Sequence, residues 1–397
     1  SVTYKLVTYK KGIYLYKKNM EKVPFTYGRI AADEDFTDRQ AELKRLIDNF
    51  DALVNTILIS PRRWGKTSLV KEAGAICESK HKNLKVISID IFNIRDEKEF
   101  YLALSNRILK ATSNSWEDFA ANAKLFLSRF IPTVTFSPDK QTDLSFGISW
   151  KELEKQPDDI LDLAENIARK KELQLVICID EFQNIMQFGN PDAFQQKLRS
   201  HWQNHQQVAY CLYGSKRHIL RDIFSDPSKP FYKFGDLMLL DKIPESEWIV
   251  FLCRRFQDTG KTLLPDDARL IARLADNHPY YVQQLAQQAW FRTHDECNQD
   301  IVLSAHEDIV NQLSLLFANS TEKLSSFQIH LLKAVLSGEK QLTAKETLEK
   351  YQLGTSANVV RLKRLLIENE ILDDTGEELS FLDPMYKYWL QKNFFKK

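Results

Sequence analysis

The sequence predicts an α/β fold, in which a five-stranded parallel sheet covered by helices is followed by two smaller units. Five short apolar runs typical of strands alternate with amphipathic helical patterns through the first 240 residues, which is the order found in parallel sheets. Beyond residue 241 the apolar residues recur at helical spacing, which indicates an all-helical unit. Three helical patterns and a hairpin pattern then close the sequence, as in a winged helix.

Each element of the α/β region can be placed. The predicted strands are residues 54–60, 84–92, 173–180, 208–214 and 236–240. The predicted helices are residues 38–50, 66–80, 97–112, 116–130 and 157–171. Two alternating runs around a polar turn at residues 133–150 predict an inserted hairpin rather than a core strand. We therefore expect one α/β domain over residues 20–240.

The remaining patterns define two further domains and an amino-terminal extension. Helical spacing at 245–259, 265–277, 280–293 and 305–318 predicts a helical lid over residues 241–323. Helices at 328–336, 343–351 and 356–369, with a hairpin at 371–381, predict a winged-helix domain over residues 324–397. Residues 1–19 alternate like a strand. They are interpreted either as an added edge strand or as a segment outside the native reading frame.

Composition excludes several classes of protein. The chain has 397 residues and a formal net charge of +1, so no overall field points to nucleic acid or to a membrane surface. No apolar run reaches the roughly 18 residues that a membrane helix needs. The five cysteines are scattered without any C-x-x-C pair, which favours a reducing cytoplasm and argues against a zinc site.

The first predicted strand runs directly into a sequence close to the phosphate-binding pattern G-x-x-x-x-G-K-[ST]. The candidate residues are Ser60, Pro61, Arg62, Arg63, Trp64, Gly65, Lys66, Thr67 and Ser68. Backbone N–H groups at the start of a helix bind phosphate. In this pattern Lys66 bridges the β- and γ-phosphates of a nucleotide, and the Thr67 hydroxyl is a ligand of Mg²⁺.

Ser60 departs from the pattern because it replaces the first glycine. If the backbone φ were positive there, a residue with a Cβ would cost about 1 kcal/mol or more. We expect only a modest loss of binding, since the N–H groups around the phosphate come from Arg63 to Thr67. Trp64 is expected to pack beneath the loop rather than to stack on a base.

A second element lies at a suitable distance along the chain. The apolar run at residues 175–179 is typical of a strand buried on both faces, and it ends in Asp180 and Glu181. Carboxylates at the carboxyl end of such a strand face the ligand crevice. Asp180 is therefore expected to hold Mg²⁺, and Glu181 to accept a proton from water as a catalytic base. Gln183 and Asn184 are interpreted either as a polar cluster around that water or as ordinary surface polarity.

These motifs resemble the prokaryotic P-loop ATPases of the STAND/AAA+ type, the archaeal-ATPase or MNS-clade group. An aromatic-glycine segment at residues 25–28 precedes Phe-x-x-Arg-x-x-Glu-Leu at 36–43, and the loop at 61–69 has the form found in that group. Gly214-Ser215 and the closing segment at 381–390 also match, so that the resemblance covers roughly residues 22–397.

The resemblance implies ATP and Mg²⁺ as ligands and adds site residues. It places Phe25, Tyr27, Gly28 and Arg39 beside the adenine, with His278 and Pro279 approaching from the helical lid. It makes Ser215 a γ-phosphate sensor, which joins Lys66 and Glu181 as catalytic residues. No arginine finger can be assigned, because the run at residues 231–236 lacks the arginine that relatives often carry after their Pro-Phe-Tyr segment. The nearby cations are Arg62, Arg63, Lys216 and Arg217, and for each a solvated surface role is favoured.

Three functions agree with these observations. The first is a slowly hydrolysing regulatory ATPase that acts on a protein partner or through self-association. The second is a DNA-associated initiator-type ATPase, and the third is a nucleotide-binding scaffold with little turnover. Residues 325–397 carry 11 Lys/Arg against 10 Asp/Glu. The hairpin is acidic at Asp373, Asp374, Glu377 and Glu378, and the helix before it offers only Arg361, Lys363 and Arg364. DNA is therefore not favoured as the partner.

Overall fold

The computed structural model describes residues 4–9, 12–17, 23–30, 37, 39–127, 158–374 and 379–396. The chain divides into two compact units. The first comprises Asp38–Lys242 and Leu324–Asp383, and the second comprises Ser1–Thr37, Ile243–Lys323 and Pro384–Lys397. The hairpin predicted at residues 133–150 lies outside the described residues.

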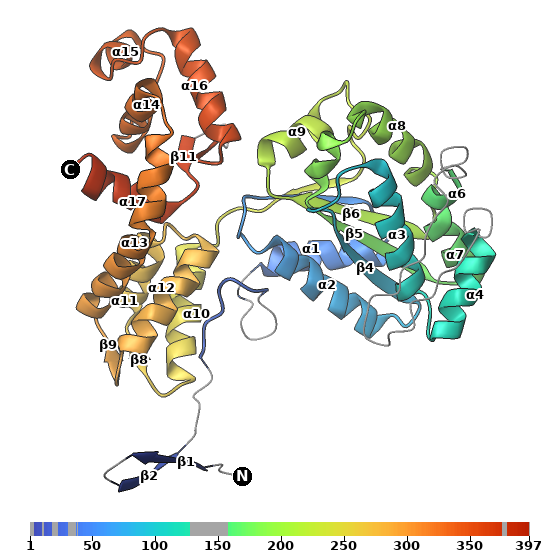
Figure 1. Ribbon diagram of the computed structural model, residues 1–397, viewed down its shortest axis with the longest axis horizontal. Helices are drawn as coiled ribbons and strands as arrows, with labels where there is room; N and C mark the ends of the chain where they lie inside the picture. Colours follow the sequence, from blue (N-terminus) through green and yellow to red (C-terminus); the bar gives the residue numbers. More distant parts are fainter. Residues whose placement is uncertain are drawn as a thin grey trace. The chain divides into compact units, whose positions relative to one another are not determined.

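A five-stranded parallel sheet forms the centre of the first unit (Figure 1). Its strands are β3 (Thr56–Ile59), β4 (Leu84–Asp90), β5 (Gln174–Asp180), β6 (Val208–Gly214) and β7 (Asp236–Leu239). Their order in the sheet is β4-β5-β6-β3-β7, and every pairing is parallel. The predicted fold class is confirmed, with one strand in each of the five predicted places. Because the strands are parallel, the residues that follow β3, β5 and β6 meet at one edge of the sheet.

Helices cover both faces of this sheet. On one face lie α1 (Gln40–Asp51) and α2 (Lys66–Lys80), and on the other lie α3 (Glu97–Ala111), α7 (Leu163–Lys171), α8 (Pro191–Trp202) and α9 (Arg217–Ser225) (Figure 1). The second group packs on a continuous apolar core that includes Ile57, Ile177 and Leu212 from three neighbouring strands. At the outer side α4 (Trp116–Leu127) follows α3, and α6 (Asp158–Leu161) precedes α7 where one longer helix was predicted.

The winged helix follows the predicted order of three helices and a hairpin. Its elements are α14 (Ser326–Leu336), α15 (Lys345–Lys350), α16 (Ser356–Glu368), β10 (Leu372–Asp374) and β11 (Leu379–Phe381). A capping box begins α14, because the Ser325 hydroxyl accepts from the backbone N–H of Gln328 and the Gln328 side chain accepts from the backbone N–H of Ser325. The hairpin turn is predicted around residues 374–376, and residues 375–378 lie outside the described residues.

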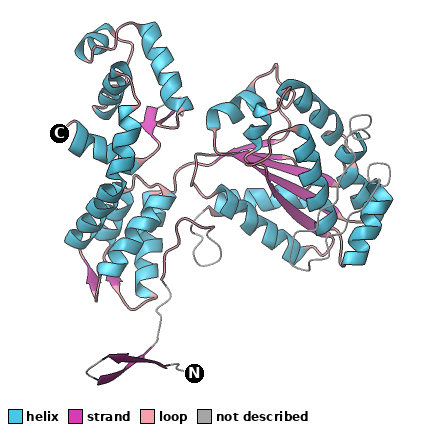
Figure 2. Cartoon of the chain, in the orientation of Figure 1, coloured by secondary structure: helices cyan, strands magenta, loops and turns pink. Residues whose placement is uncertain are grey.

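The second unit is mainly helical (Figure 2). It contains α10 (Glu245–Gln257), α11 (Pro265–Leu274), α12 (Pro279–Arg292), α13 (Gln299–Glu322) and α17 (Pro384–Trp389), which ends in a short π-helical turn (Leu390–Phe394). The prediction of an all-helical unit over residues 241–323 missed a short parallel pair, β8 (Thr262–Leu263) with β9 (Glu296–Cys297). Two-residue strands are too short to show a period of two in the sequence.

The amino-terminal residues also belong to the second unit. The strands β1 (Tyr4–Tyr9) and β2 (Gly12–Lys17) pair with each other in an antiparallel two-stranded sheet. Phe25 is fully buried against the rings of Phe251 and Phe256. The Arg255 guanidinium donates to the Pro24 carbonyl at 2.7 Å, which fixes the chain beside α10.

Two further predictions can be compared with the described residues. None of their helices combines the length and the apolar character that crossing a bilayer requires. All five cysteines are free thiols, and four of them are buried, as expected for small apolar side chains.

Candidate functional site

The loop between β3 and α2 has the backbone of an anion site. Positive φ angles occur at Arg63 (64°) and Gly65 (89°), and Ser60 is not among the residues with positive φ. The concern about strain at Ser60 was therefore wrong. Ser60 is buried, and its hydroxyl donates to the Pro61 carbonyl at 3.1 Å. Gly65, with its left-handed backbone, is the N-cap of α2, so that the first N–H groups of that helix face the loop.

Lys66 is the first residue of α2 and is buried, with only 6% of its surface exposed. Its ammonium donates to the Pro61 carbonyl at 3.3 Å. Burial lowers the pKa of Lys66, and the carboxylates of Glu181 and Asp180 act in the opposite direction. A buried cation with so few partners is stabilised by an anion, and the start of a helix favours an anion at the same point.

Thr67 and Asp180 join the loop to β5. The Thr67 hydroxyl donates to Asp180 Oδ2 at 2.8 Å, and the other Asp180 oxygen accepts from the backbone N–H of Glu181 at 2.9 Å. Burial raises the pKa of Asp180 to about 6, despite the hydroxyl and Lys66. A partly buried carboxylate of this kind is suited to a divalent cation, which would favour its ionised form.

No cluster of three or more His, Cys, Asp or Glu side chains that could hold a metal occurs in the part of the chain that the structure describes. A divalent ion beside Thr67 and Asp180 would therefore need water or phosphate oxygens for the rest of its ligands. This is how Mg²⁺ is usually bound, because the ion keeps several waters and relies on one or two carboxylates. The donor set fits Mg²⁺ on a nucleotide better than a metal site made of protein alone.

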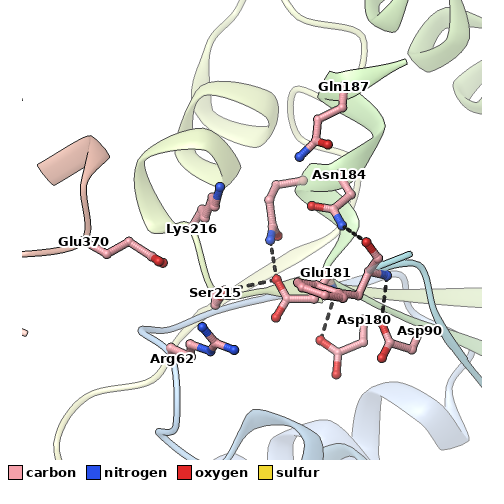
Figure 3. A pocket seen from close by; sticks show the side chains of 11 residues that line it. Arg62, Asp90, Asp180, Glu181, Asn184, Gln187, Ser215, Lys216 and Glu370 are labelled. Carbon is pink, nitrogen blue, oxygen red and sulfur yellow. Dashed lines mark hydrogen bonds between the residues drawn. The ribbon is translucent and has the colours of Figure 1, made fainter. Parts of the chain in front are cut away.

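Glu181 follows Asp180 and points toward the end of β6 (Figure 3). Its backbone is left-handed, with φ of 55°. The Ser215 hydroxyl donates to Glu181 Oε2 at 3.0 Å, and the side-chain amide of Gln183 donates to the same oxygen. The carboxylate is thus held at the carboxyl edge of the sheet, between the ends of β5 and β6.

A cavity of about 530 Å³ opens at this edge. It is lined by Arg62, Asp90, Phe92, Asp180, Glu181, Gln183, Asn184, Gln187, Ser215, Lys216 and Glu370. Of the four nearby cations named from the sequence, Arg62 and Lys216 reach the cavity, as Figure 3 shows. Arg217 does not line it, because its guanidinium is buried in an ion pair with Asp373 of β10. Arg63 is exposed.

Two residues left ambiguous by the sequence prove to be internal. Gln183 and Asn184 are only 2% and 7% exposed, so surface polarity was the wrong interpretation of this pair. The Asn184 amide donates to the carbonyls of Ile91 and Phe92 at 3.3 and 3.0 Å, which holds the chain after β4 against the turn after β5.

Other cavity residues were not identified from the sequence. Asp90 is the last residue of β4 and lies in register with Asp180. Because polar residues at the carboxyl ends of parallel strands lie at one edge of the sheet, the sequence could have indicated Asp90 as a site residue. No comparable pattern in the sequence indicates the cavity residues Phe92, Gln187 and Glu370. Glu370 comes from the segment after α16, which is distant along the chain.

Three other predicted nucleotide residues of the first unit, Trp64, Ser68 and Arg39, are not among those that line this cavity. Trp64 and Ser68 are buried near the start of α2, as expected for Trp64. Arg39 is buried, and its guanidinium donates to Glu42 at 2.9 Å and to the Asp241 carbonyl at 2.7 Å.

The remaining predicted nucleotide residues belong to the second unit. They are Phe25, Tyr27, Gly28, His278 and Pro279. There the ring of Tyr27 lies edge-on to Tyr280, and His278 is buried with its ring against Tyr281. The histidine therefore has the character of a core residue at the start of α12.

Comparison with known proteins agrees with the fold. A family described as "Probable winged helix domain" matches residues 315–392. The Walker-type ATPase PABY2304 of Pyrococcus abyssi has a similar structure, with a TM-score of 0.62 and 15% identity over 92% of this chain and 99% of that one. The ORC2 protein of Aeropyrum pernix gives a TM-score of 0.58 and 16% identity over 92% and 94%. No curated protein matches in sequence. The chain thus has the fold of P-loop ATPases with a carboxy-terminal winged helix.

Proposed function

We propose that this protein binds ATP with Mg²⁺ and hydrolyses it slowly. In this proposal its nucleotide state positions the helical lid and the winged helix for a protein partner or for self-association. The proposal places the chain with the STAND-type archaeal ATPases, because the motifs at the phosphate loop, at Asp180-Glu181 and at Gly214-Ser215 resemble those of that group. A cytoplasmic location is part of the same proposal.

The observation that carries the proposal is the hydrogen bond between the Thr67 hydroxyl and Asp180, at 2.8 Å. These residues are 113 positions apart in sequence. Both are the residue types that hold Mg²⁺ in phosphate-loop proteins, and the buried ammonium of Lys66 neighbours Thr67 in sequence. Neither an isolated loop nor an isolated acidic turn would make this arrangement.

Each residue then has a chemical role. The N–H groups from Arg63 to Thr67 and the ammonium of Lys66 would bind the phosphates, and Thr67 and Asp180 would hold Mg²⁺. Bound there, the ion would neutralise phosphate charge as a Lewis acid. Glu181 would accept a proton from the water that attacks the terminal phosphorus, as the bond to ADP breaks. Ser215, which donates to Glu181, would lie on the side of the terminal phosphate.

A protein partner is favoured over DNA because the basic residues of α16 already have partners. The Lys363 ammonium lies 2.7 Å from Asp374, and the Arg364 guanidinium lies 2.7 Å from Glu368. Arg361 donates to Asn358 at 3.1 Å. Each phosphate contact by these side chains would replace an existing contact, so DNA binding would gain less than the charges alone suggest.

The test uses the full chain in two nucleotide states. Calorimetry measures Mg-ATP and Mg-ADP affinity, and phosphate release measures turnover. Hydrogen exchange of the winged helix is then compared between the ADP form and the Glu181→Gln form loaded with ATP. We expect binding, slow turnover and a change in exchange at residues 324–374. Binding without turnover would favour the scaffold, and identical exchange in both states would contradict the switch.

A further inference from the structure

We infer that Gln183 is a positioning residue for the proposed catalytic base, and that it holds the Glu181 carboxylate in its working orientation together with Ser215. The inference rests on the proposed hydrolysis of ATP and adds to it a residue whose role the sequence left ambiguous. Gln183 comes two residues after the base, in the 3₁₀ turn η2 (Phe182–Gln187).

The contacts define one orientation of the carboxylate. Glu181 Oε2 accepts from the Gln183 amide and from the Ser215 hydroxyl, so two donors from two elements restrain the same oxygen. A base works best when its free oxygen is held within hydrogen-bond reach of the proton that it removes. The remaining oxygen, Oε1, is the one left to receive a proton from water.

The orientation of the Gln183 amide follows from charge. Turning the amide over would bring its carbonyl oxygen against the carboxylate, which an ionised Glu181 would repel. With the NH₂ group on Glu181, the carbonyl oxygen Oε1 is buried and makes no hydrogen bond within the described residues. An unsatisfied buried acceptor is costly and calls for an explanation. A role in holding the base supplies one.

Gly214 provides the space for this amide. A Cβ on Gly214 would lie 1.9 Å from Gln183 Oε1, which no structure permits without movement. A side chain on Gly214 would therefore displace the Gln183 amide from its place beside Glu181. A single carboxylate oxygen, Glu181 Oε2, thus accepts from Gln183 and Ser215, and Gly214 leaves the space that the Gln183 side chain occupies.

The experiment compares Gln183→Leu and Gln183→Glu in the full chain, with steady-state turnover and Mg-ATP calorimetry. We expect kcat to fall about ten- to hundredfold in Gln183→Leu, while KM and the ATP dissociation constant stay within about twofold because no phosphate contact is lost. Gln183→Glu, although nearly the same shape, should lose more, because it places a second carboxylate against Glu181.

Gln195→Leu is the matched control. Gln195 is also fully buried, donates to the Met186 sulfur and does not line the cavity, so its kcat should match wild type. Thermal melting of every variant checks folding, and Gln183→Met replaces Gln183→Leu if the latter does not melt cooperatively. Wild-type turnover in Gln183→Leu overturns the inference and leaves the proposed function intact. No turnover in wild type refutes both, whereas loss of ATP affinity in Gln183→Leu refutes positioning alone.

Discussion

Two regions of the first unit carry charged side chains in similar number, yet only one of them has the character of a site. At the edge of the sheet Lys66, Asp180 and Glu181 are wholly or partly withdrawn from water, and they converge from α2 and the end of β5. On α16 the basic residues lie along one helix, and each contacts a neighbour on that helix or on the adjacent hairpin.

The difference shows that desolvation and convergence matter more than the count of charges. Burial lowers the pKa of Lys66 and raises that of Asp180 to about 6, so both groups gain from a ligand of the opposite charge. An exposed pair such as Arg364 with Glu368 is worth at most about 1 kcal/mol and has little to gain from a further ligand.

The largest effect is expected at Glu181. Glu181→Gln keeps the shape of the side chain and leaves Asp180 in place, but it removes the group that accepts a proton. Turnover should drop by about 10²-fold or more while Mg-ATP binding persists. Phosphate release under saturating ATP, together with calorimetry, measures both quantities.

Glu172→Gln is a suitable control for this variant. Glu172 is exposed and lies just before β5, at the end of the strand opposite Asp180. Its loss should leave turnover unchanged. Equal turnover in Glu181→Gln and wild type would remove Glu181 from the mechanism and weaken the contrast between the two regions.

Lys66→Ala tests the cation at the sheet edge. We expect ATP affinity to fall more than about tenfold, because this ammonium is the buried charge that would face two phosphates. Calorimetry with Mg-ATP measures the loss. Lys71→Ala, on the exposed side of the same helix, should bind as wild type does. Unchanged affinity in Lys66→Ala would show that this loop is not the nucleotide site.

The pH dependence of Mg-ATP binding tests Asp180. Its pKa is raised to about 6, so the carboxylate is ionised at pH 7 and mostly protonated at pH 5. A bound proton competes with Mg²⁺, and affinity should therefore weaken about tenfold between pH 7 and pH 5. The same titration with EDTA in place of Mg²⁺ reports protonation of the nucleotide itself. Identical pH dependence with and without Mg²⁺ would contradict the role of Asp180.

The sequence was sufficient to predict the parallel sheet and the winged helix, because both depend on periodicity and on turns close in sequence. It also led to Lys66, Thr67 and Asp180 as candidates, since the spacing of the loop and the end of an apolar strand are local signals, and the structure joins Thr67 to Asp180 by a hydrogen bond. It could not predict the order β4-β5-β6-β3-β7, which depends on where each crossover helix packs.

The cavity was predicted less completely for a related reason. Gln183 and Asn184 are polar residues after a strand, and the sequence does not say whether such residues face water or the core. Their burial is set by Gly214 and by the carbonyls of Ile91 and Phe92, which are distant along the chain. Glu370 reaches the cavity from a segment 189 residues after Glu181, and only tertiary structure reveals this.

The smallest effect is expected for DNA. Three phosphate contacts from Arg361, Lys363 and Arg364 would give a salt slope of about −2.7 in log K against log salt. Since Lys363 and Arg364 are already paired with Asp374 and Glu368, the observed slope should be shallower and binding weak, without sequence preference. The salt slope is measured by titrating DNA duplexes of mixed sequence with the full chain at two salt concentrations, with ATP present throughout. Nanomolar affinity at physiological salt that is lost in the Arg361→Glu, Arg364→Glu double variant would make α16 a nucleic-acid site after all. That result would also show that exposed ion pairs can yield to a polyanion when enough phosphates are offered at once.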